Sequence, residues 1–202
     1  MGRTILPLTY LPDIEWFSHF LSDEECIIDI GEHYIKRSAR NRTSIMSANG
    51  VLSLSIPLLR ANRPQTPMER VEIDHSQRWA AQHWRAIESA YRSSPYFEIL
   101  EEYFRPVFDH AEEYPKLVDF NMALLRATLR FMGSKAKIQL SENYVVATED
   151  DCDLRPKNRP LTITPKPYFQ LFSDRFPFAE NLSILDLLMS EGLDAAQVVK
   201  NA

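Results

Sequence analysis

The chain has 202 residues, a length typical of a single domain, and its 45% hydrophobic and 25% charged residues are the composition of an ordinary globular protein. Its formal net charge of −5 argues against binding along a long nucleic acid, because such binding normally takes a basic domain. The sequence has no run of roughly 20 apolar residues that could span a bilayer, and its N-terminus lacks the apolar core of a signal peptide. We therefore expect a cytoplasmic protein without a membrane span.

Cysteines and histidines form no recognisable metal or redox motif. Cys26 and Cys152 are too few for a disulfide scaffold, and neither has a partner at metal-ligand spacing. The five histidines are scattered and include no His-x-x-x-His pair. The chain also lacks the glycine-rich phosphate-binding motifs. We expect no metal site, and the cofactor stays unassigned.

The first thirty residues predict a β-α-β unit. Apolar runs at residues 5–8 and 25–30 are strand candidates. Residues 14–21 between them carry apolar side chains at helical spacing, and Pro12 before them is a common helix start signal. Two strands joined by a helix in this way are expected to pair in parallel.

A hairpin and then a series of helices are predicted in the rest of the chain. Asn49-Gly50, between two strand-like runs, is typical of a hairpin turn. Periodic apolar residues predict three long helices beyond residue 78 and a last helix at residues 181–189. Residues 135–166 are irregular, and residues 168–172 are a short strand candidate.

These elements predict an α/β fold in one domain over residues 1–192, with a frayed tail at residues 193–202. The sheet is expected to be mixed and partly parallel, opened by the β-α-β unit and covered by helices from the C-terminal half of the chain. Its strands are expected near residues 5, 27, 45, 54 and 71. The covering helices are expected to start near residues 13, 78, 95 and 115.

A cationic segment at residues 36–42 is the strongest functional signal. Although the chain is acidic, four of these seven residues are basic, and two more can form hydrogen bonds. Arginines in such a loop bind phosphate or carboxylate oxygens through paired hydrogen bonds. The alternative is a solvated loop whose cations pair with nearby acids. The predicted anion-binding residues are Lys36, Arg37, Arg40, Asn41 and Arg42, with Ser38 as a further hydrogen-bonding residue.

A catalytic site would also need a general base. His83 and Asp29 are the candidates, with Asp186 as a more distant one. His83 borders an apolar helix face and could instead be a structural histidine. Asp29 could pair with the arginines, and Asp186 could serve the N-terminal end of its helix.

Four polar residues embedded in apolar motifs are further site candidates: Asn121, Tyr168, Gln170 and Asn181. Buried amides are costly when they have no partner, so these groups are expected to converge on one polar pocket. We expect at least two of them within side-chain reach of residues 36–42. The alternative is that each one caps its own helix end or bonds local backbone.

Five motifs in matching order make residues 5–192 resemble the WbqC-like protein family. They are Tyr10-Leu11-Pro12 leading into Trp16-Phe17, then Lys36-Arg37-Ser38 with Asn41-Arg42, then His83-Trp84-Arg85 with Tyr91 and Ser94-Pro95-Tyr96-Phe97, then Asp119-Phe120-Asn121, and finally Tyr168-Phe169-Gln170 with Asn181-Leu182-Ser183-Ile184-Leu185-Asp186-Leu187-Leu188. The chain differs from the O-antigen members of this family in having Glu15 where they often have glycine.

The resemblance implies a bacterial protein connected with O-antigen or other surface-polysaccharide biosynthesis. It implies an acyl or aminoacyl transferase, with glycine as one transferred group, that uses the basic loop to hold a phosphate-bearing small molecule or nucleotide-sugar. The sequence alone leaves a second hypothesis open. With no evident nucleophile, the protein could instead be a non-catalytic anion- or nucleotide-binding module that serves a partner enzyme.

Overall fold

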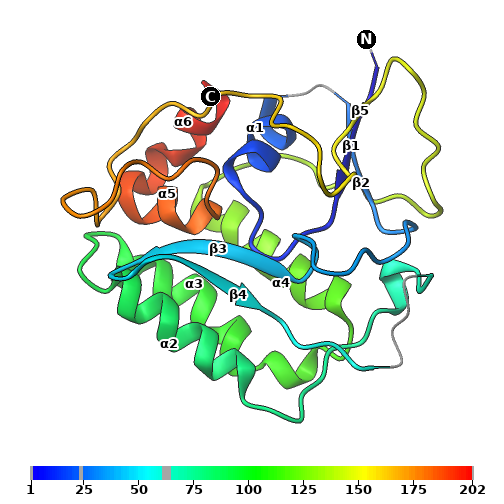
Figure 1. Cartoon of the computed structure of the whole chain (residues 1–202). Helices are drawn as coiled ribbons and strands as arrows, with labels where there is room; N and C mark the ends of the chain where they lie inside the picture. The colour runs from blue at the N-terminus through cyan, green and yellow to red at the C-terminus, as the bar shows by residue number, and fades with distance from the viewer. Residues whose placement is uncertain (1, 23–24, 61–64, 202) are drawn as a thin grey trace.

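The computed structural model describes residues 2–22, 25–60 and 65–201, which fold around a small parallel sheet and a separate hairpin. In the parallel sheet, β1 (Thr4–Pro7) lies between β2 (Cys26–Asp29) and β5 (Cys152–Asp153). Figure 1 shows this sheet at one side of the molecule, close to helix α1 (Ile14–Ser22). The α/β class is confirmed, and β1, α1 and the parallel β2 form the predicted β-α-β unit.

Burial explains why β1 is the central strand. All four of its residues are buried, and Ile5 lies opposite Ile27 on one side and Asp153 on the other. The indole N–H of Trp16 donates to the carbonyl oxygen of Pro7 at 2.7 Å, which fixes the start of α1 beside the C-terminal end of β1. This end of a parallel sheet is where α/β proteins usually bind their ligands.

The hairpin does not join the parallel sheet, so the expectation of one mixed sheet is wrong in this detail. Strands β3 (Arg42–Ser47) and β4 (Gly50–Ser55) pair with each other in an antiparallel sheet of their own. β3 packs against α2 (Trp79–Tyr91) and α5 (Ile184–Glu191), and Figure 1 shows the hairpin crossing the molecule between these helices. The strand expected near residue 71 is replaced by a short 3-10 helix, η1 (Met68–Arg70), and isolated bridges at Glu72 and Ile73.

Helices α1, α2, α3 (Phe97–Asp109) and α4 (Leu117–Phe131) begin within two residues of the predicted positions. A second 3-10 helix, η2 (Ala111–Glu113), links α3 to α4. α4 is buried on most of its surface, because α3 packs along one side and η1 contacts it as well. It therefore supplies much of the core and also carries Asn121, whose side chain is fully buried.

Helical structure continues after α5 as far as Lys200, where the sequence predicted a frayed tail from residue 193. η3 (Gly192–Asp194) and α6 (Ala195–Lys200) follow α5, and α6 packs against α1 with Ala195 and Val199 fully buried. The strand expected at residues 168–172 is absent: residues 168–170 have no regular structure and a turn begins at residue 171, where the amide of Ser173 donates to the carbonyl oxygen of Gln170 at 2.9 Å. Across residues 2–22, 25–60 and 65–201, no helix has both the length and the apolar character to cross a membrane.

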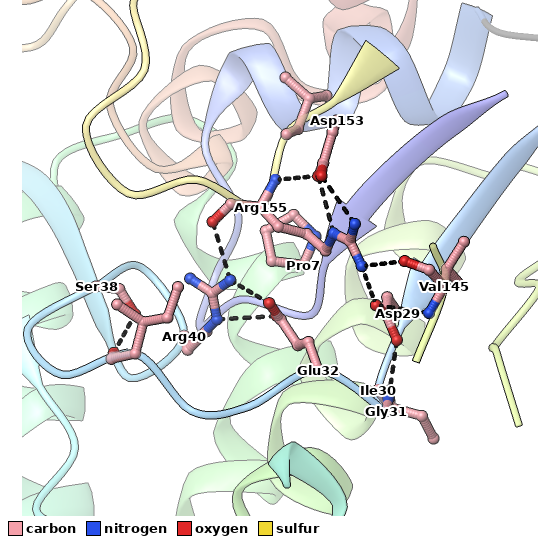
Figure 2. Close-up of polar contacts among 12 residues, drawn as sticks. Pro7, Asp29, Ile30, Gly31, Glu32, Ser38, Arg40, Val145, Asp153 and Arg155 are labelled. Carbon is pink, nitrogen blue, oxygen red and sulfur yellow. Dashed lines mark hydrogen bonds and ion pairs between the residues drawn. The ribbon is translucent and has the colours of Figure 1, made fainter. Parts of the chain in front are cut away.

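A buried ion-pair network joins the C-terminal edge of the sheet to the basic loop (Figure 2). The Arg155 guanidinium, only 5% exposed, pairs with Asp29 at the end of β2 and with Asp153 of β5. Arg40 pairs with Glu32 and donates to the carbonyl oxygen of Arg155 at 3.0 Å. Each of these buried charges thus has an oppositely charged partner, and Arg155, Asp29 and Arg40 make further hydrogen bonds, which stabilise charges away from water.

We predict that Arg155→Met destabilises the protein by about 3–5 kcal/mol, because it leaves Asp29 buried without its cation. Urea denaturation measures this loss. Arg105→Met is the control, since the Arg105 pair with Glu101 on α3 is half exposed and its loss is expected to cost about 0–1 kcal/mol. Equal losses in the two variants would contradict the role given to the buried network.

Candidate anion-binding cleft

Two cavities meet at the C-terminal end of β1. The first, called here the loop cavity, has a volume of about 250 Å³. The second, called the adjacent cavity, has about 180 Å³. Both are lined by five shared residues, so they form two halves of one cleft: Thr9, Asp13, Ser38, Ala39 and Asn181.

Several residues with left-handed backbone conformation line the loop cavity. Among the described residues, positive φ angles outside glycine occur at Leu11 (45°), Arg37 (55°) and Asn181 (52°), and all three residues line this cavity. Asparagine adopts this conformation readily, but leucine and arginine do so at a cost of about 1–3 kcal/mol each. Strain of this kind concentrates at functional sites, so its coincidence with a cavity supports a functional role.

Some cationic side chains of the basic loop are free to bind a ligand, and others are paired within the protein. Arg37 and Arg42 are exposed and line the loop cavity, and neither guanidinium has a hydrogen-bond or ion-pair partner in the part of the chain that the structure describes. Arg40 is buried and paired with Glu32, so it shares the pairing but not the solvent exposure that the alternative interpretation of this loop expected. Lys36 is exposed but lines neither half of the cleft.

Asn41 is held by the scaffold. Its amide nitrogen donates to the carbonyl oxygen of Ile56 at 2.8 Å, and its amide oxygen accepts from the Tyr34 hydroxyl at 3.1 Å. Ser38 donates to the carbonyl oxygen of Ile35 at 2.6 Å. Both residues therefore shape the loop, while Arg37 and Arg42 keep free donors at the cavity.

Two helices begin at the cleft. Asp13 precedes α1 and Ser183 is the N-cap of α5, and both line the loop cavity. The positive ends of both helix dipoles therefore favour negative charge here. The first amides of each helix already have partners, including Asn181 for Glu15 and Ser183 for Leu185. An anion would thus be held by side chains, with the dipoles adding a favourable field.

Asp13 is the one carboxylic acid that lines both halves of the cleft. It accepts a hydrogen bond from the Trp16 amide at 2.9 Å and another from the Asn181 side chain. Burial and, to a smaller extent, the nearby charge of Glu15 outweigh the lowering effect of these hydrogen bonds and of Arg159, so the net result is a pKa raised from 3.8 to about 6. A carboxyl group with this pKa can take up and release a proton near neutral pH.

Thr9 supplies an unused hydroxyl to the cleft. It is 4% exposed and lines both halves, yet its Oγ1 has no hydrogen-bond partner among the described residues. A buried hydroxyl without a partner normally costs stability. A ligand in the cleft could provide the missing partner.

The wall of the adjacent cavity is built around Glu15, which is 1% exposed. Arg159 donates to both of its carboxylate oxygens, at 2.8 and 2.7 Å, and the amide and hydroxyl of Thr162 donate to one of them. These bonds lower the pKa of Glu15 despite its burial. Glu15 therefore attaches the irregular segment that follows β5 to helix α1.

The predicted general bases lie away from the cleft. His83 on α2 accepts or donates a hydrogen bond with the Tyr10 hydroxyl at 2.9 Å, and burial lowers its pKa to about 4. Asp29 is fully buried and bonded to Arg155, Ser141 and backbone amides. Asp186 is also fully buried and accepts from Tyr91 at 2.7 Å. None of the three lines either half of the cleft.

Of the four embedded polar residues, two lie at the basic loop. Asn121 donates to the carbonyl oxygen of Arg40 at 2.8 Å, and Asn181 lines both halves of the cleft. Tyr168 instead donates to Asp186 at 2.8 Å. Gln170 bonds the amide and carbonyl of Ala179, each at 3.0 Å, which is the local backbone bonding considered as the alternative.

Sequence reasoning missed Asp13, Thr9 and Arg159. Asp13 follows Pro12 at a predicted helix start, and this position was interpreted only as a start signal. Thr9 and Arg159 are single polar residues in segments without periodicity, so no pattern identified them. Only the folded chain shows that all three border the same cleft.

Comparisons with known proteins place the chain in a family without defining its chemistry. The uncharacterized protein Rv1507c of Mycobacterium tuberculosis is 27% identical over 143 residues, which are 71% of this chain and 61% of the relative. The chain thus matches less than two thirds of that relative's length. No solved structure matches it. The model of the WbqC-like protein family matches residues 8–166, a range that includes the basic loop and Asp13, and the chain belongs to this family.

Proposed function

We propose that the protein is an acyl or aminoacyl transferase that holds a phosphate-bearing small molecule in the cleft and uses Asp13 as its general base. The observation that carries the proposal is that the free Arg37 and Arg42 lie in the same cavity as Asp13, whose pKa is raised to about 6. The acceptor class is taken from the family resemblance: a surface polysaccharide or its nucleotide-sugar precursor.

The charges of the loop cavity support phosphate as the recognised group. Arg37 and Arg42 offer free planar donors that match phosphate oxygens in pairs, and two helix dipoles add to the positive potential. Small hydroxyl residues complete the lining, with Ser44 and Ser53 on the hairpin facing this cavity. Lys36 remains part of the proposal as a mobile charge that attracts the ligand from outside the cavity.

Asp13 suits proton transfer because its surroundings raise its pKa only to about 6, so its carboxyl group is still ionised at neutral pH and can accept a proton. In the proposed reaction, Asp13 accepts the proton of an attacking amine or hydroxyl while the new bond to the acyl carbon forms and the bond to the donor's leaving group breaks. Arg37 and Arg42 would hold the phosphate of the donor or of the acceptor. His83 and Asp29 are left out of this step because their side chains are engaged elsewhere.

We predict that Arg37→Gln combined with Arg42→Gln abolishes phosphate binding while folding stability changes by less than about 1 kcal/mol. Pyrophosphate and ribose 5-phosphate are suitable probes in a thermal-shift assay. A ligand at 100 times its Kd stabilises a protein by about 2.7 kcal/mol, roughly 5–10 °C for a chain of this size.

The matched control is Arg85→Gln with Arg126→Gln, which removes two exposed arginines from α2 and α4 and is expected to leave the shift intact. If the cleft variant unfolds, its arginines belong to the scaffold. If it still binds the probes, the anion site lies elsewhere. Either result contradicts the proposal.

We predict that Asp13→Asn is more stable than the natural chain at pH 8, by about 1–3 kcal/mol. The folded chain holds the Asp13 proton more tightly than the unfolded chain does, so this carboxyl group loses its stabilising effect as the pH rises from about 4 to above 6. The difference between the two proteins should therefore vanish below pH 4. Urea denaturation at pH 4, 6 and 8 measures it.

Asp74→Asn is the control with the opposite sign, because the hydroxyl and amide of Ser76 lower the pKa of Asp74, which is partly exposed. Asp74→Asn is expected to lose stability at pH 8.

Asp13→Asn should also keep phosphate binding while it abolishes transfer. A variant that transfers normally would show that Asp13 is not the base, and a natural chain that binds phosphate without any transfer would favour the non-catalytic binding module.

A further inference from the structure

A third cavity lies beyond the cleft, on the far side of the chain that leaves β5. It is called here the ring pocket and has a volume of about 490 Å³, which is within the range of small-molecule sites. It shares Arg155 and Pro156 with the adjacent cavity, so these two residues separate it from the cleft. Its lining consists of Gly31, Glu32, His33, Ile35, Tyr144, Asp153, Arg155 and Pro156.

Tyr144 provides a flat aromatic surface in this pocket. Its residue is 57% exposed, although most large apolar residues of the chain are buried. The Arg155 guanidinium lies 4.7 Å from the centre of the Tyr144 ring. Arg155 is itself held by Asp29, Asp153 and the carbonyl oxygen of Val145, and Figure 2 shows these groups around its guanidinium. The ring therefore rests on a rigid support.

The backbone that carries Tyr144 is also closely packed. An added Cβ at Gly31 would lie 2.3 Å from the backbone nitrogen of Tyr144, so only glycine permits this approach. The neighbouring Val145 amide donates to Asp29 at 3.3 Å, and the Val145 carbonyl accepts from Arg155 at 2.8 Å. An exposed aromatic ring on such a constrained segment is a preformed binding surface, since little conformational freedom is lost when a ligand stacks on it.

The charges assign different parts of one ligand to the two regions. Glu32 and Asp153 line the ring pocket and are paired with Arg40 and Arg155, so this pocket has no free arginine for phosphate among its lining residues. The remaining lone pairs of the two carboxylates can accept hydrogen bonds from the N–H groups of a heterocycle. The free arginines, by contrast, line the loop cavity. A ligand that fits both regions carries a flat polar ring at one end and phosphate at the other.

We propose that the ring pocket binds the base of a nucleotide whose phosphates lie in the cleft, with the base stacked on Tyr144. This inference rests on the proposed function for the placement of the phosphates and adds the substrate class. Base–aromatic stacking contributes about 1–3 kcal/mol per base, which corresponds to roughly 5–150-fold in affinity. The nucleotide would pass Arg155 and Pro156, the two residues that line both the adjacent cavity and the ring pocket.

The test compares ADP with ribose 5-phosphate and adenosine by calorimetry on the full chain. In the natural protein, ADP is expected to bind at least 5-fold more tightly than ribose 5-phosphate. Tyr144→Leu keeps apolar contact with Arg155 but removes the ring, and it should bring ADP to the affinity of ribose 5-phosphate. Tyr144→Phe keeps the ring and should keep the advantage. Gly31→Ala should weaken ADP selectively, because it displaces the segment that carries Tyr144.

Saturation-transfer NMR on the adenine protons gives a second readout, which is expected to be strong in the natural chain and lost in Tyr144→Leu. Equal binding of ADP and ribose 5-phosphate, or an unchanged ADP affinity in Tyr144→Leu, would overturn the inference. If Arg37→Gln with Arg42→Gln leaves ribose 5-phosphate binding intact while Tyr144→Leu still weakens ADP, the ring pocket stands and the proposed phosphate site fails.

Discussion

The buried guanidinium of Arg155 is the interaction on which the rest of the site depends. It satisfies the carboxylates that end β2 and β5, Asp29 and Asp153, so the C-terminal edge of the parallel sheet is neutralised from within the protein. The backbone carbonyl oxygen of Arg155 accepts a hydrogen bond from the Arg40 guanidinium, and the Arg40 carbonyl oxygen accepts one from the side chain of Asn121 on α4. Sheet, basic loop and central helix are thus joined through charges that cannot lose a partner without a large cost.

This network determines which cations are available to a ligand. Arg40 is paired with Glu32, whereas Arg37, in a left-handed conformation, lines the loop cavity together with Arg42. The strain at Leu11 and Arg37, the raised pKa of Asp13 and the unpartnered hydroxyl of Thr9 all reduce stability, and all occur at one cleft. Proteins commonly accept such costs where a site must be preorganised.

The irregular chain between α4 and α5 supplies part of the cleft wall, mostly in the adjacent cavity. Between α4 and α5 the described structure contains only the two-residue strand β5, and side chains replace the missing regular hydrogen bonds. Asp151 accepts from the amide and guanidinium of Arg3, Glu15 accepts from Arg159 and Thr162, and Gln170 bonds both backbone groups of Ala179. Long loops of this kind are usually functional in compact domains, and here the loop contributes Lys157 and Arg159 to the adjacent cavity and Tyr144 to the ring pocket.

The sequence by itself determined the elements whose signal is local. Apolar periodicity located the starts of α1 to α4 within two residues, Asn49-Gly50 marked the hairpin turn, and the run of cations marked the loop that borders the cleft. These predictions succeed because periodicity, turn chemistry and charge density are properties of short segments. The sequence also indicated Asn181 and Asn121 as polar residues out of place, and both lie at the loop.

Only the tertiary structure decided what those residues do. Whether a cation is free depends on a distant carboxylate, so Arg40 could not be separated from Arg37 before Glu32 was seen beside it. Burial raises the pKa of Asp13 and lowers that of His83, and burial depends on how helices and loops far apart in the chain pack together. The third strand of the sheet, β5, has two residues and no periodicity of its own, so it forms only through its pairing with β1. Pairing, burial and strain arise between segments, and a pattern within one segment cannot contain them.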